Sequence, residues 1–512
     1  MIAPSYRAGR QPTPFLLIAL IVFALLTVLL AGLLIGSAQW VWLGGLLLLG
    51  VVLPGLIYVG TLHVEDRRGR LLLFGWIVML TAHGLHSRIG LPVGYVLELV
   101  LFPLAWASTR SVLSRAATDR TLRLFVALVT LYFAIALLSS ALGRSHAIAA
   151  LWQLQYNLKW PLMFGLGTLV AWSERSDDLL RKLIAWSWLA IVPFLVLEVV
   201  SLSLHTRIFE LNPDMSGNPL LGVGRRYRGP FFHAGYMAIV CGLLAAGAFS
   251  QWLAGRGVRW ALLTFLYLVF VLASGQRQEF AALILVLVLL LAIMWRRYWA
   301  IFALSGLVFG VLTVAGLVYV EHVPMRDTLA QWGLFDDYRP LSERAILSRA
   351  GIVIAEQYFP LGSGLGTYGG AGAQKFDLSL FWDLGFGRNW WFRQGLFIVD
   401  TYWPCVIAES GFIGALSVAV ALVTMWFALL RRAWFAVATP SFFVAFVGLA
   451  ALTLLVANTP SSAVITDPRG SFVFWLLIGA AWRANGPPDL TNRIRTVRRD
   501  YASNVPQRRS AD

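Results

Sequence analysis

Long apolar runs dominate the chain, and short polar segments separate them. A membrane-spanning helix needs roughly 20 mostly apolar residues, because lipid cannot satisfy free backbone polar groups. About fourteen runs approach that length, near 14–35, 39–60, 71–86, 91–108, 122–143, 158–173, 183–203, 231–252, 259–275, 279–295, 299–320, 400–430, 436–457 and 471–483. Several runs are short, so the pattern also fits twelve. The sequence therefore predicts an all-α polytopic membrane protein with about 12–14 transmembrane helices.

One extramembrane segment, 321–397, is long enough to fold by itself. It carries eight acidic and seven basic residues and is rich in Trp, Phe and Gly. A helix is expected at 341–358, which Pro360 and a glycine cluster then end. The predicted organisation is a transmembrane bundle over 1–320, this loop domain over 321–397, further transmembrane helices over 398–483, and a disordered basic tail over 484–512.

Composition narrows the class further. Of 512 residues, 59% are hydrophobic and only 13% are charged, whereas soluble domains carry about 25% charged residues. This excludes a soluble globule, a disordered chain and a secreted disulfide scaffold. Cys241 and Cys405 both lie in apolar runs, so no structural disulfide is expected.

The formal net charge is +16, which in a soluble protein would indicate nucleic acid. Here the basic residues follow the topology: 25 lie on alternate segments that include both chain ends, and nine lie on the short segments between them. Because cytoplasmic loops of membrane proteins carry the excess of Lys and Arg, both termini are expected in the cytoplasm. The tail would then lie at the anionic inner leaflet. The net charge therefore predicts membrane lipids as partners, and no nucleic-acid partner is expected.

The basic residues that break this rule are the informative ones. RRYRGPFFHAG places Arg225, Arg226, Arg228 and His233 just before the eighth run, and SGQRQEF places Arg277 in a turn of about three residues. A snorkelling arginine would explain Arg277 without any function. Alternatively, converging guanidinium groups, whose fork matches phosphate oxygens, would hold a diphosphate without a metal.

A second signal is VDTYWPCVIAESGFIGAL, which follows the long loop. Asp400 is placed at the expected start of a helix, where an N-cap role is the alternative, and Glu409 lies within the apolar run, where an ionisable group indicates function. Nine helical residues separate the two carboxyls by about 13.5 Å and turn them apart. A glycosidase carboxylate pair needs about 5–9.5 Å, so each must act singly.

Two further cations complete the substrate-binding candidates. Lys159 is expected at the outer start of the sixth run, and Arg344 lies on the helical section of the long loop. The histidines are scattered without metal-ligand spacing. No metal and no cofactor are predicted.

Four segments together resemble the O-antigen polymerase/ligase superfamily of bacterial envelope polysaccharide enzymes, often called Wzy and WaaL. RYRGPFFHAGYMA is similar to its Arg-Gly-Phe motif, with Arg226 and His233 at the matching positions. SGQRQEFAALIL is similar to its Ser-x-x-Arg turn, with Arg277 in the arginine position. YFPLGSGLGTYG resembles its Pro-x-x-Gly-x-Gly segment, and DTYWPCVIAESGFIGAL its Glu-x-Gly-x-x-Gly helix.

The resemblance covers about residues 220–430 and implies a GT-C-like bundle with the large loop in the periplasm. It implies an inner-membrane enzyme whose donor is an undecaprenyl-diphosphate-linked glycan held by Arg226 and Arg277. Asp400 would take the proton of an acceptor hydroxyl, with inversion at the anomeric carbon. Two departures matter. Ligases typically have His at the position of Asp400, and Ala234-Gly235 replaces a Pro-Asn after His233.

Three functions stay open at this point. The leading one is a polymerase of lipid-linked repeat units for an O-antigen or exopolysaccharide, with a glycan acceptor and a chain-length regulator as candidate partners. The second is a ligase that transfers the glycan to lipid A core or another acceptor. The third is a transporter or flippase of the same lipid, which the concentration of unusual charges at one face disfavours.

Overall fold

The structure is a computed structural model that describes residues 71–81, 108–209, 225–298 and 342–484, apart from 171, 232 and 438. In these residues all regular secondary structure is helical and no strand occurs. The expected spans at 14–35, 39–60 and 299–320, nearly all of 91–108, and the basic tail after 484 lie outside the described residues.

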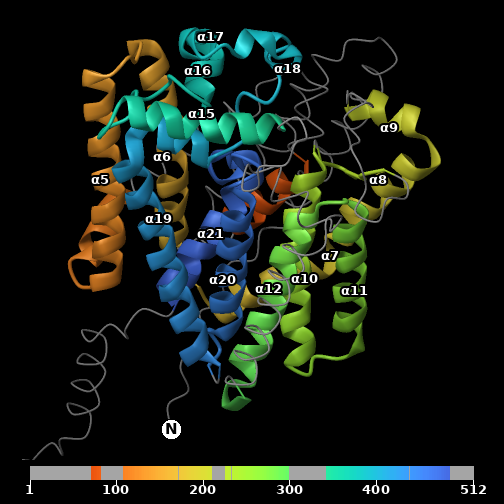
Figure 1. Ribbon diagram of the computed structural model, residues 1–512. Helices are drawn as coiled ribbons and strands as arrows, with labels where there is room; N and C mark the ends of the chain where they lie inside the picture. Colours follow the sequence, from red (N-terminus) through yellow and green to blue (C-terminus); the bar gives the residue numbers. More distant parts are fainter. Residues whose placement is uncertain are drawn as a thin grey trace, which may run out of the picture.

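Long helices run alternately up and down through the main body (Figure 1). They are α5 (Arg120–Leu142), α6 (Ala147–Leu169), α7 (Glu174–Trp186), α8 (Trp188–Val200), α10 (Ala234–Leu253), α11 (Val258–Ala273), α12 (Arg277–Met294), α19 (Trp403–Ala436), α20 (Phe442–Asn458) and α21 (Pro468–Ala484). Nearly every residue of α10, α20 and α21 is buried, so these helices form the centre. α10 contacts α11, α12 and α20, and α19 contacts α5 and α20.

Five helical segments of the described chain are long and apolar enough to cross a membrane: Arg120–Leu142, Glu174–Val200, Ala234–Leu253, Arg277–Met294 and Trp403–Ala436. Large apolar side chains also cover outward faces, for example Leu131 on α5 and Phe265 on α11, which is 67% exposed. Soluble monomers rarely expose broad apolar surface. The all-α prediction is confirmed for the described residues, and these helices indicate a membrane protein.

The helix ends agree with the apolar runs in some places and differ in others. The runs at 122–143, 259–275 and 279–295 match α5, α11 and α12 within about two residues. The run at 158–173 is the second half of α6, which begins at Ala147. Polar residues such as Gln153 and Asn157 interrupt the apolar pattern there, but both are buried against neighbouring helices. The run at 183–203 belongs to α7 and α8, which begin at Glu174 after the N-cap Ser173.

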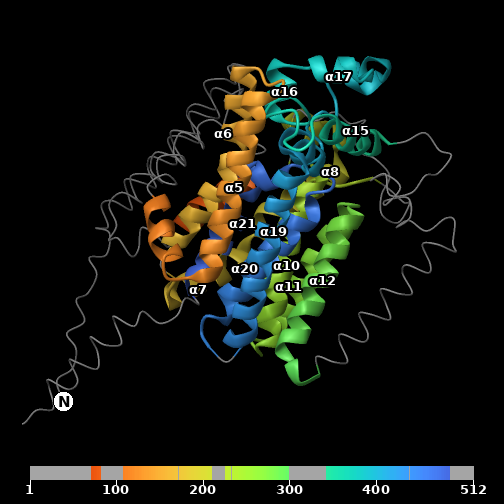
Figure 2. The same cartoon turned by 60° about the vertical axis from the view of Figure 1, so that its left-hand side comes forward.

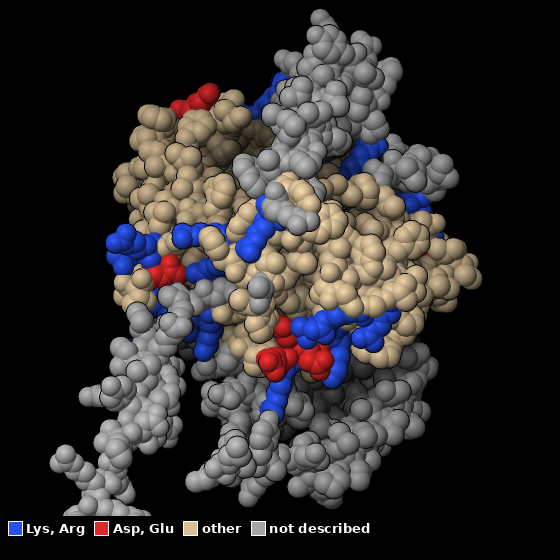
Figure 3. Space-filling view, turned by 90° about the horizontal axis from the view of Figure 1, so that it is seen from below, with Lys and Arg blue, Asp and Glu red and all other residues tan. Residues whose placement is uncertain are grey.

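The two ends of the bundle differ in charge. We call the end with the N-terminus of α5 and the C-termini of α6, α12, α19 and α21 the basic end. Segments predicted to face the cytoplasm meet there, such as 109–123 and 174–182. Figure 3 views the molecule from this side and shows groups of Lys and Arg around the face, with fewer Asp and Glu. The opposite end is called the loop end.

The loop end carries a layer of short helices: α15 (Glu343–Gln357), α16 (Ala371–Phe376), α17 (Ser379–Asp383) and α18 (Trp390–Arg393). α15 confirms the helix expected at 341–358 and lies across the top of the bundle (Figures 1 and 2). This layer has its own aromatic core, in which Tyr368 stacks on Phe381 with ring centroids 4.7 Å apart. The layer gives the loop end a fixed covering.

Candidate functional site

Three arginines from separate parts of the sequence lie close together at the loop end. Arg226 precedes α10, Arg277 is the first residue of α12, and Arg344 is in the first turn of α15. Burial lowers the pKa of Arg226, the nearby charges of Arg277 and Arg344 lower it further, and Glu279 opposes them. We call Arg226, Arg277 and Arg344 the arginine group. The structure thus joins two arginines from the sequence motifs to one from the long loop.

Local backbone structure explains why Arg226 and Arg277 meet. α11 and α12 are joined by Ser274, Gly275 and Gln276, which is the three-residue turn that the sequence predicted. Gly275 has a φ of 66°, a value that favours glycine. The backbone N–H of Tyr227 donates to the carbonyl of Ala273, at 3.1 Å. This bond holds the segment that carries Arg226 against the turn that precedes Arg277.

Asp400 is the acidic partner of the arginine group. Arg344 Nε donates to Asp400 Oδ2 at 2.6 Å, and about a quarter of each side chain is exposed. The alternative of an N-cap is wrong, because α19 begins three residues later, after Tyr402. Burial raises the pKa of Asp400 above its usual value, and Arg344 opposes that rise. The carboxylate is therefore held beside the arginines by a residue of the loop layer.

Glu279 adds a second carboxyl next to the arginine group, and sequence reasoning did not single it out. It is 4% exposed and lies in the first turn of α12. Asn458 Nδ2 donates to Glu279 Oε1 at 2.5 Å. The signal was visible, because Glu279 stands two residues after Arg277 in the same turn motif. Asn458 ends an apolar helix, where its polarity was also readable.

His233 lies at the N-terminus of α10 and acts as its N-cap. Its Nδ1 accepts a hydrogen bond from the Gly235 N–H at 3.0 Å. Part of the side chain is exposed, yet desolvation by the surrounding protein, followed by the charges of Arg228, Arg344 and Arg226, lowers its pKa to about 4. At neutral pH the imidazole is uncharged and accepts this bond. His233 therefore borders the arginine group without adding charge to it.

Arg225 and Arg228 are directed to a different partner, the buried Glu198 of α8. The backbone N–H groups of Arg228 and Gly229 both donate to Glu198 Oε2 at 2.9 Å. Arg225 Nη2 donates to the Glu198 carbonyl. Burial lowers the pKa of the Arg228 guanidinium, and Glu198 opposes this. These contacts fix the segment that carries Arg226 against α8. Arg225 and Arg228 therefore help to position Arg226.

Glu409 holds the glycine-rich turn of the loop layer. Its Oε1 accepts from the Gly366 N–H at 2.8 Å and from the Tyr368 N–H at 3.3 Å. Its backbone carbonyl accepts from the Gly364 N–H at 3.0 Å. α19 is kinked nearby at Gly411, with φ 65° and ψ −177°, where a Cβ would come within 2.6 Å of the Pro360 carbonyl. These contacts assign Glu409 a bracing role.

Lys159 is not at the start of its helix. α6 begins twelve residues earlier, at Ala147, so Lys159 lies about 18 Å along the helix. It is 6% exposed, and its ammonium lies 4.2 Å from the centre of the Tyr156 ring.

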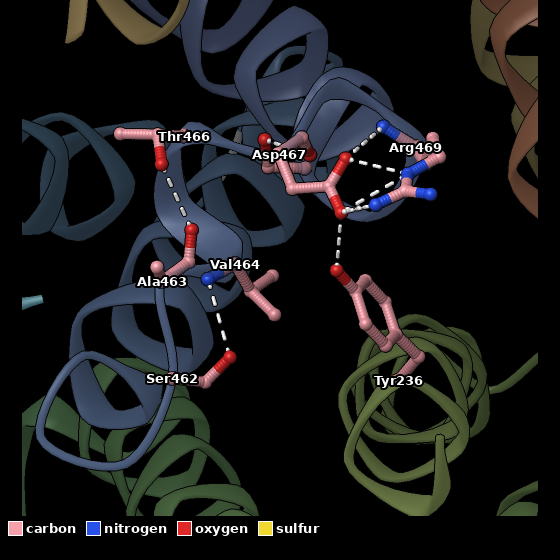
Figure 4. Close-up of polar contacts among 8 residues, drawn as sticks. Tyr236, Ser462, Ala463, Val464, Thr466, Asp467 and Arg469 are labelled. Carbon is pink, nitrogen blue, oxygen red and sulfur yellow. Dashed lines mark hydrogen bonds and ion pairs between the residues drawn. The ribbon is translucent and has the colours of Figure 1, made fainter. Parts of the chain in front are cut away.

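A second charged contact joins α10 to the start of α21. Tyr236 Oη donates to Asp467 Oδ2 at 2.6 Å, and Arg469 Nη2 bonds the same oxygen at 2.9 Å (Figure 4). The sequence does not predict this contact, because the contact depends on which helices are neighbours in the fold. With the Asp467 carboxylate bound by both partners, we interpret the cluster as a link between helices.

Metal ligands do not gather in the described part of the chain, where no group of three His, Cys, Asp or Glu side chains has the arrangement for an ion. The two cysteines are buried and unpaired with one another. The charged side chains that meet at the loop end are guanidinium groups and carboxylates.

Comparison with known proteins finds no match: no protein-family model and no curated protein matches the chain.

Proposed function

We propose that this protein is a membrane glycosyltransferase that polymerises undecaprenyl-diphosphate-linked oligosaccharide repeat units. The observation that carries the proposal is the meeting of Arg226, Arg277 and Arg344 with Asp400 at one end of an apolar helical bundle. It agrees with the resemblance to the O-antigen polymerase/ligase superfamily, in which the first two arginines and the acid match motif positions. Asp400, in place of the ligases' histidine, favours polymerisation.

The arginine group suits a diphosphate. Three guanidinium groups face two carboxyls, Asp400 and Glu279, so the site carries an excess of positive charge. Arg277 also begins α12, and the free N–H groups of a helix N-terminus favour anions. Arginine forks match phosphate oxygens in pairs. A lipid diphosphate would therefore bind with its phosphates at Arg226 and Arg277.

The reaction follows from that placement. The acceptor hydroxyl oxygen attacks the anomeric carbon of the donor sugar, and Asp400 takes the hydroxyl proton. The bond from the anomeric carbon to the diphosphate oxygen breaks with inversion, and undecaprenyl diphosphate leaves with the electron pair. Fixed positive charges stabilise the negative charge that develops on this leaving group. The activated lipid supplies the energy, and no metal takes part.

Asp400 needs one change before it can act as a base. Its Oδ2 is bonded by Arg344 at 2.6 Å. The donor phosphates compete for the same guanidinium, so binding of the donor would draw Arg344 away and free the carboxylate. Burial favours proton uptake by Asp400 once this partner is gone. Donor binding and activation of the base are thereby coupled.

The sidedness of the membrane belongs to the proposal as well. Most topology-setting basic residues of the described segments lie at the basic end, and the arginine group lies at the opposite, loop end. By the rule that cytoplasmic loops are basic, the loop end would face the periplasm of a bacterial inner membrane. The bundle would then be of the GT-C-like kind, with active residues on its outer face.

The test is reconstitution of the purified full chain in liposomes with the lipid-linked repeat unit and no other protein. We expect longer lipid-linked chains in gel analysis of the products. Transfer only onto an added lipid A core acceptor would replace polymerase by ligase. Movement of the lipid across the bilayer without new glycosidic bonds would overturn the enzyme proposal.

A further inference from the structure

Three polar side chains with unpartnered buried atoms lie at the loop end, where α12 meets α20. Glu279 and Asn458 are 4% and 2% exposed and bond to each other through Glu279 Oε1 and Asn458 Nδ2. Within the described chain, Glu279 Oε2, Asn458 Oδ1 and Gln276 Nε2 are buried with no hydrogen-bond partner. Buried polar atoms are nearly always bonded. Two acceptors and one donor left unsatisfied around the start of α12 and the end of α20 require an explanation.

The three atoms define which group would satisfy them. While Glu279 is ionised, its Oε2 and Asn458 Oδ1 both need a donor, so they cannot satisfy each other. A hydroxyl donates one hydrogen bond and accepts others, so two neighbouring hydroxyls can donate to both oxygens while one accepts from Gln276. A pair of adjacent hydroxyls is the recurring feature of a sugar ring.

The surrounding charges argue against a charged ligand at this place. Arg226 and Arg344 act on Glu279 electrostatically, so a cation at this place would be repelled. The Glu279 carboxyl would repel a phosphate, which has the arginine group instead. A role of Glu279 as counter-ion to the arginines explains its charge but leaves Asn458 Oδ1 and Gln276 Nε2 unsatisfied. A neutral, hydroxyl-rich ligand fits all three atoms.

The neighbourhood keeps this place narrow. A Cβ added at Gly235 would lie 3.0 Å from His233 Nδ1 and 3.7 Å from Glu279 Oε1. His233 and Glu279 therefore border the same point at the start of α10. The added Cβ would make an ordinary contact with the carboxyl and would crowd only the His233 ring.

We propose that Glu279, Asn458 and Gln276 form a sugar subsite that binds the first sugar of the donor, the one attached to the diphosphate. This rests on the proposed function, because it takes the arginine group as the diphosphate site. The Glu279 carboxyl lies within electrostatic reach of Arg226 and Arg344, which places it beside the arginine group. A sugar joined to a diphosphate at the arginine group would reach the subsite without a spacer.

The experiment compares two lipids on the full chain in detergent by native mass spectrometry. One is undecaprenyl diphosphate, and the other is the undecaprenyl-diphosphate-linked repeat unit from the cells that make the protein. We expect the wild type to bind the glycan-bearing lipid more tightly. Glu279→Gln and, as the milder variant, Gln276→Ala should each reduce that preference by roughly tenfold, the effect of one charge-assisted hydrogen bond. Affinity for undecaprenyl diphosphate should stay unchanged in Gln276→Ala and should not fall in Glu279→Gln, which removes a negative charge beside the arginine group.

A matched control is Glu409→Gln, which alters another buried carboxyl with an unpartnered Oε2 and should keep the preference. Equal binding of the two lipids by the wild type, or a preference that survives in Glu279→Gln and Gln276→Ala, would overturn the subsite and leave the proposed function standing. Failure of the wild type to bind undecaprenyl diphosphate would overturn the proposed function itself, and the subsite with it.

Discussion

The two ends of the bundle use arginine in opposite ways. At the basic end, arginines bond the carbonyls that helices leave free at their C-termini: Arg483 donates to Leu169 at the end of α6, at 2.8 Å, and Arg115 donates to Thr168, at 3.2 Å. Arg432 donates to the carbonyl of Trp482 near the end of α21. Such bonds satisfy orphan carbonyls and complement the helix dipole. These arginines are engaged with the backbone of their own bundle.

At the loop end the arginines lie at helix N-termini, where the backbone offers donors and repels cations. Arg277 and Arg344 are both in first turns, of α12 and α15. The dipole therefore adds to the positive potential that Arg226, Arg277 and Arg344 create together. We interpret this concentration of positive charge as the diphosphate site of the proposed function. The contrast shows that the partner of a guanidinium distinguishes an arginine that sets topology from a candidate site arginine better than its sequence context does.

The strongest way to break this contrast is to remove one arginine from each end. Arg226→Ala and Arg277→Ala should each lower polymerisation by about 100-fold or more, because preorganised donors at a leaving group have effects of that size. Arg431→Ala removes an exposed arginine of the basic end, whose guanidinium lies over Phe435, and should keep activity. The measurement is the initial rate of chain growth in liposomes at equal protein content.

Normal rates in both Arg226→Ala and Arg277→Ala would refute the diphosphate assignment. Equal losses in Arg431→Ala would show that general charge, and not the loop-end geometry, controls the rate.

A second comparison uses two acid–arginine pairs. Asp400 pairs with Arg344 at the loop end, and Asp119 pairs with Arg432 at the basic end, at 2.9 Å. Asp400→Asn should lower the rate by about 10²–10⁴-fold, the usual contribution of a general base, with little change in thermal stability. Asp119→Asn should keep the rate but reduce the free energy of unfolding by about 1–3 kcal/mol, because Arg432 and Trp482 both donate to Asp119 Oδ2.

Rates and melting temperatures of the two variants, measured on the same preparations, give the result. Substantial activity in Asp400→Asn would remove its role as base. A rate loss in Asp119→Asn larger than its loss of stability explains would break the division between the two ends.

Much of the fold was readable from the sequence, because lipid makes hydropathy a strong signal. The turn around Gly275 and the helix at 341–358 were both predicted close to their observed places. The start of α6 was not, since buried Gln153 donates to Asn157, and Asn157 donates to Tyr132 of α5. A buried polar network resembles a polar loop when only hydropathy is read.

The sequence pointed to individual residues of the candidate site but did not show which of them contact each other. Motif positions pointed to Arg226, Arg277 and Asp400, but the bond between Asp400 and Arg344 joins residues 56 positions apart. Glu409 shows the same limit, because the sequence marks it as an ionisable residue in an apolar run but does not reveal that its Oε1 accepts from two backbone N–H groups of a glycine-rich turn. Burial of an ionisable residue indicates a structural or functional role, and its contacts are needed to identify that role.

The subtlest test concerns the coupling between Arg344 and Asp400. Burial raises the pKa of Asp400, and Arg344 opposes that rise, so Arg344→Gln should raise the pKa further. A general base works only when deprotonated, and activity is lost as the pH falls through its pKa. The acidic limb of the profile of kcat/KM against pH should therefore move to higher pH in Arg344→Gln. It should move less in Arg344→Lys, which keeps the charge. An acidic limb that stays in place in Arg344→Gln would mean that Asp400 is not the group that titrates, or that Arg344 does not control it.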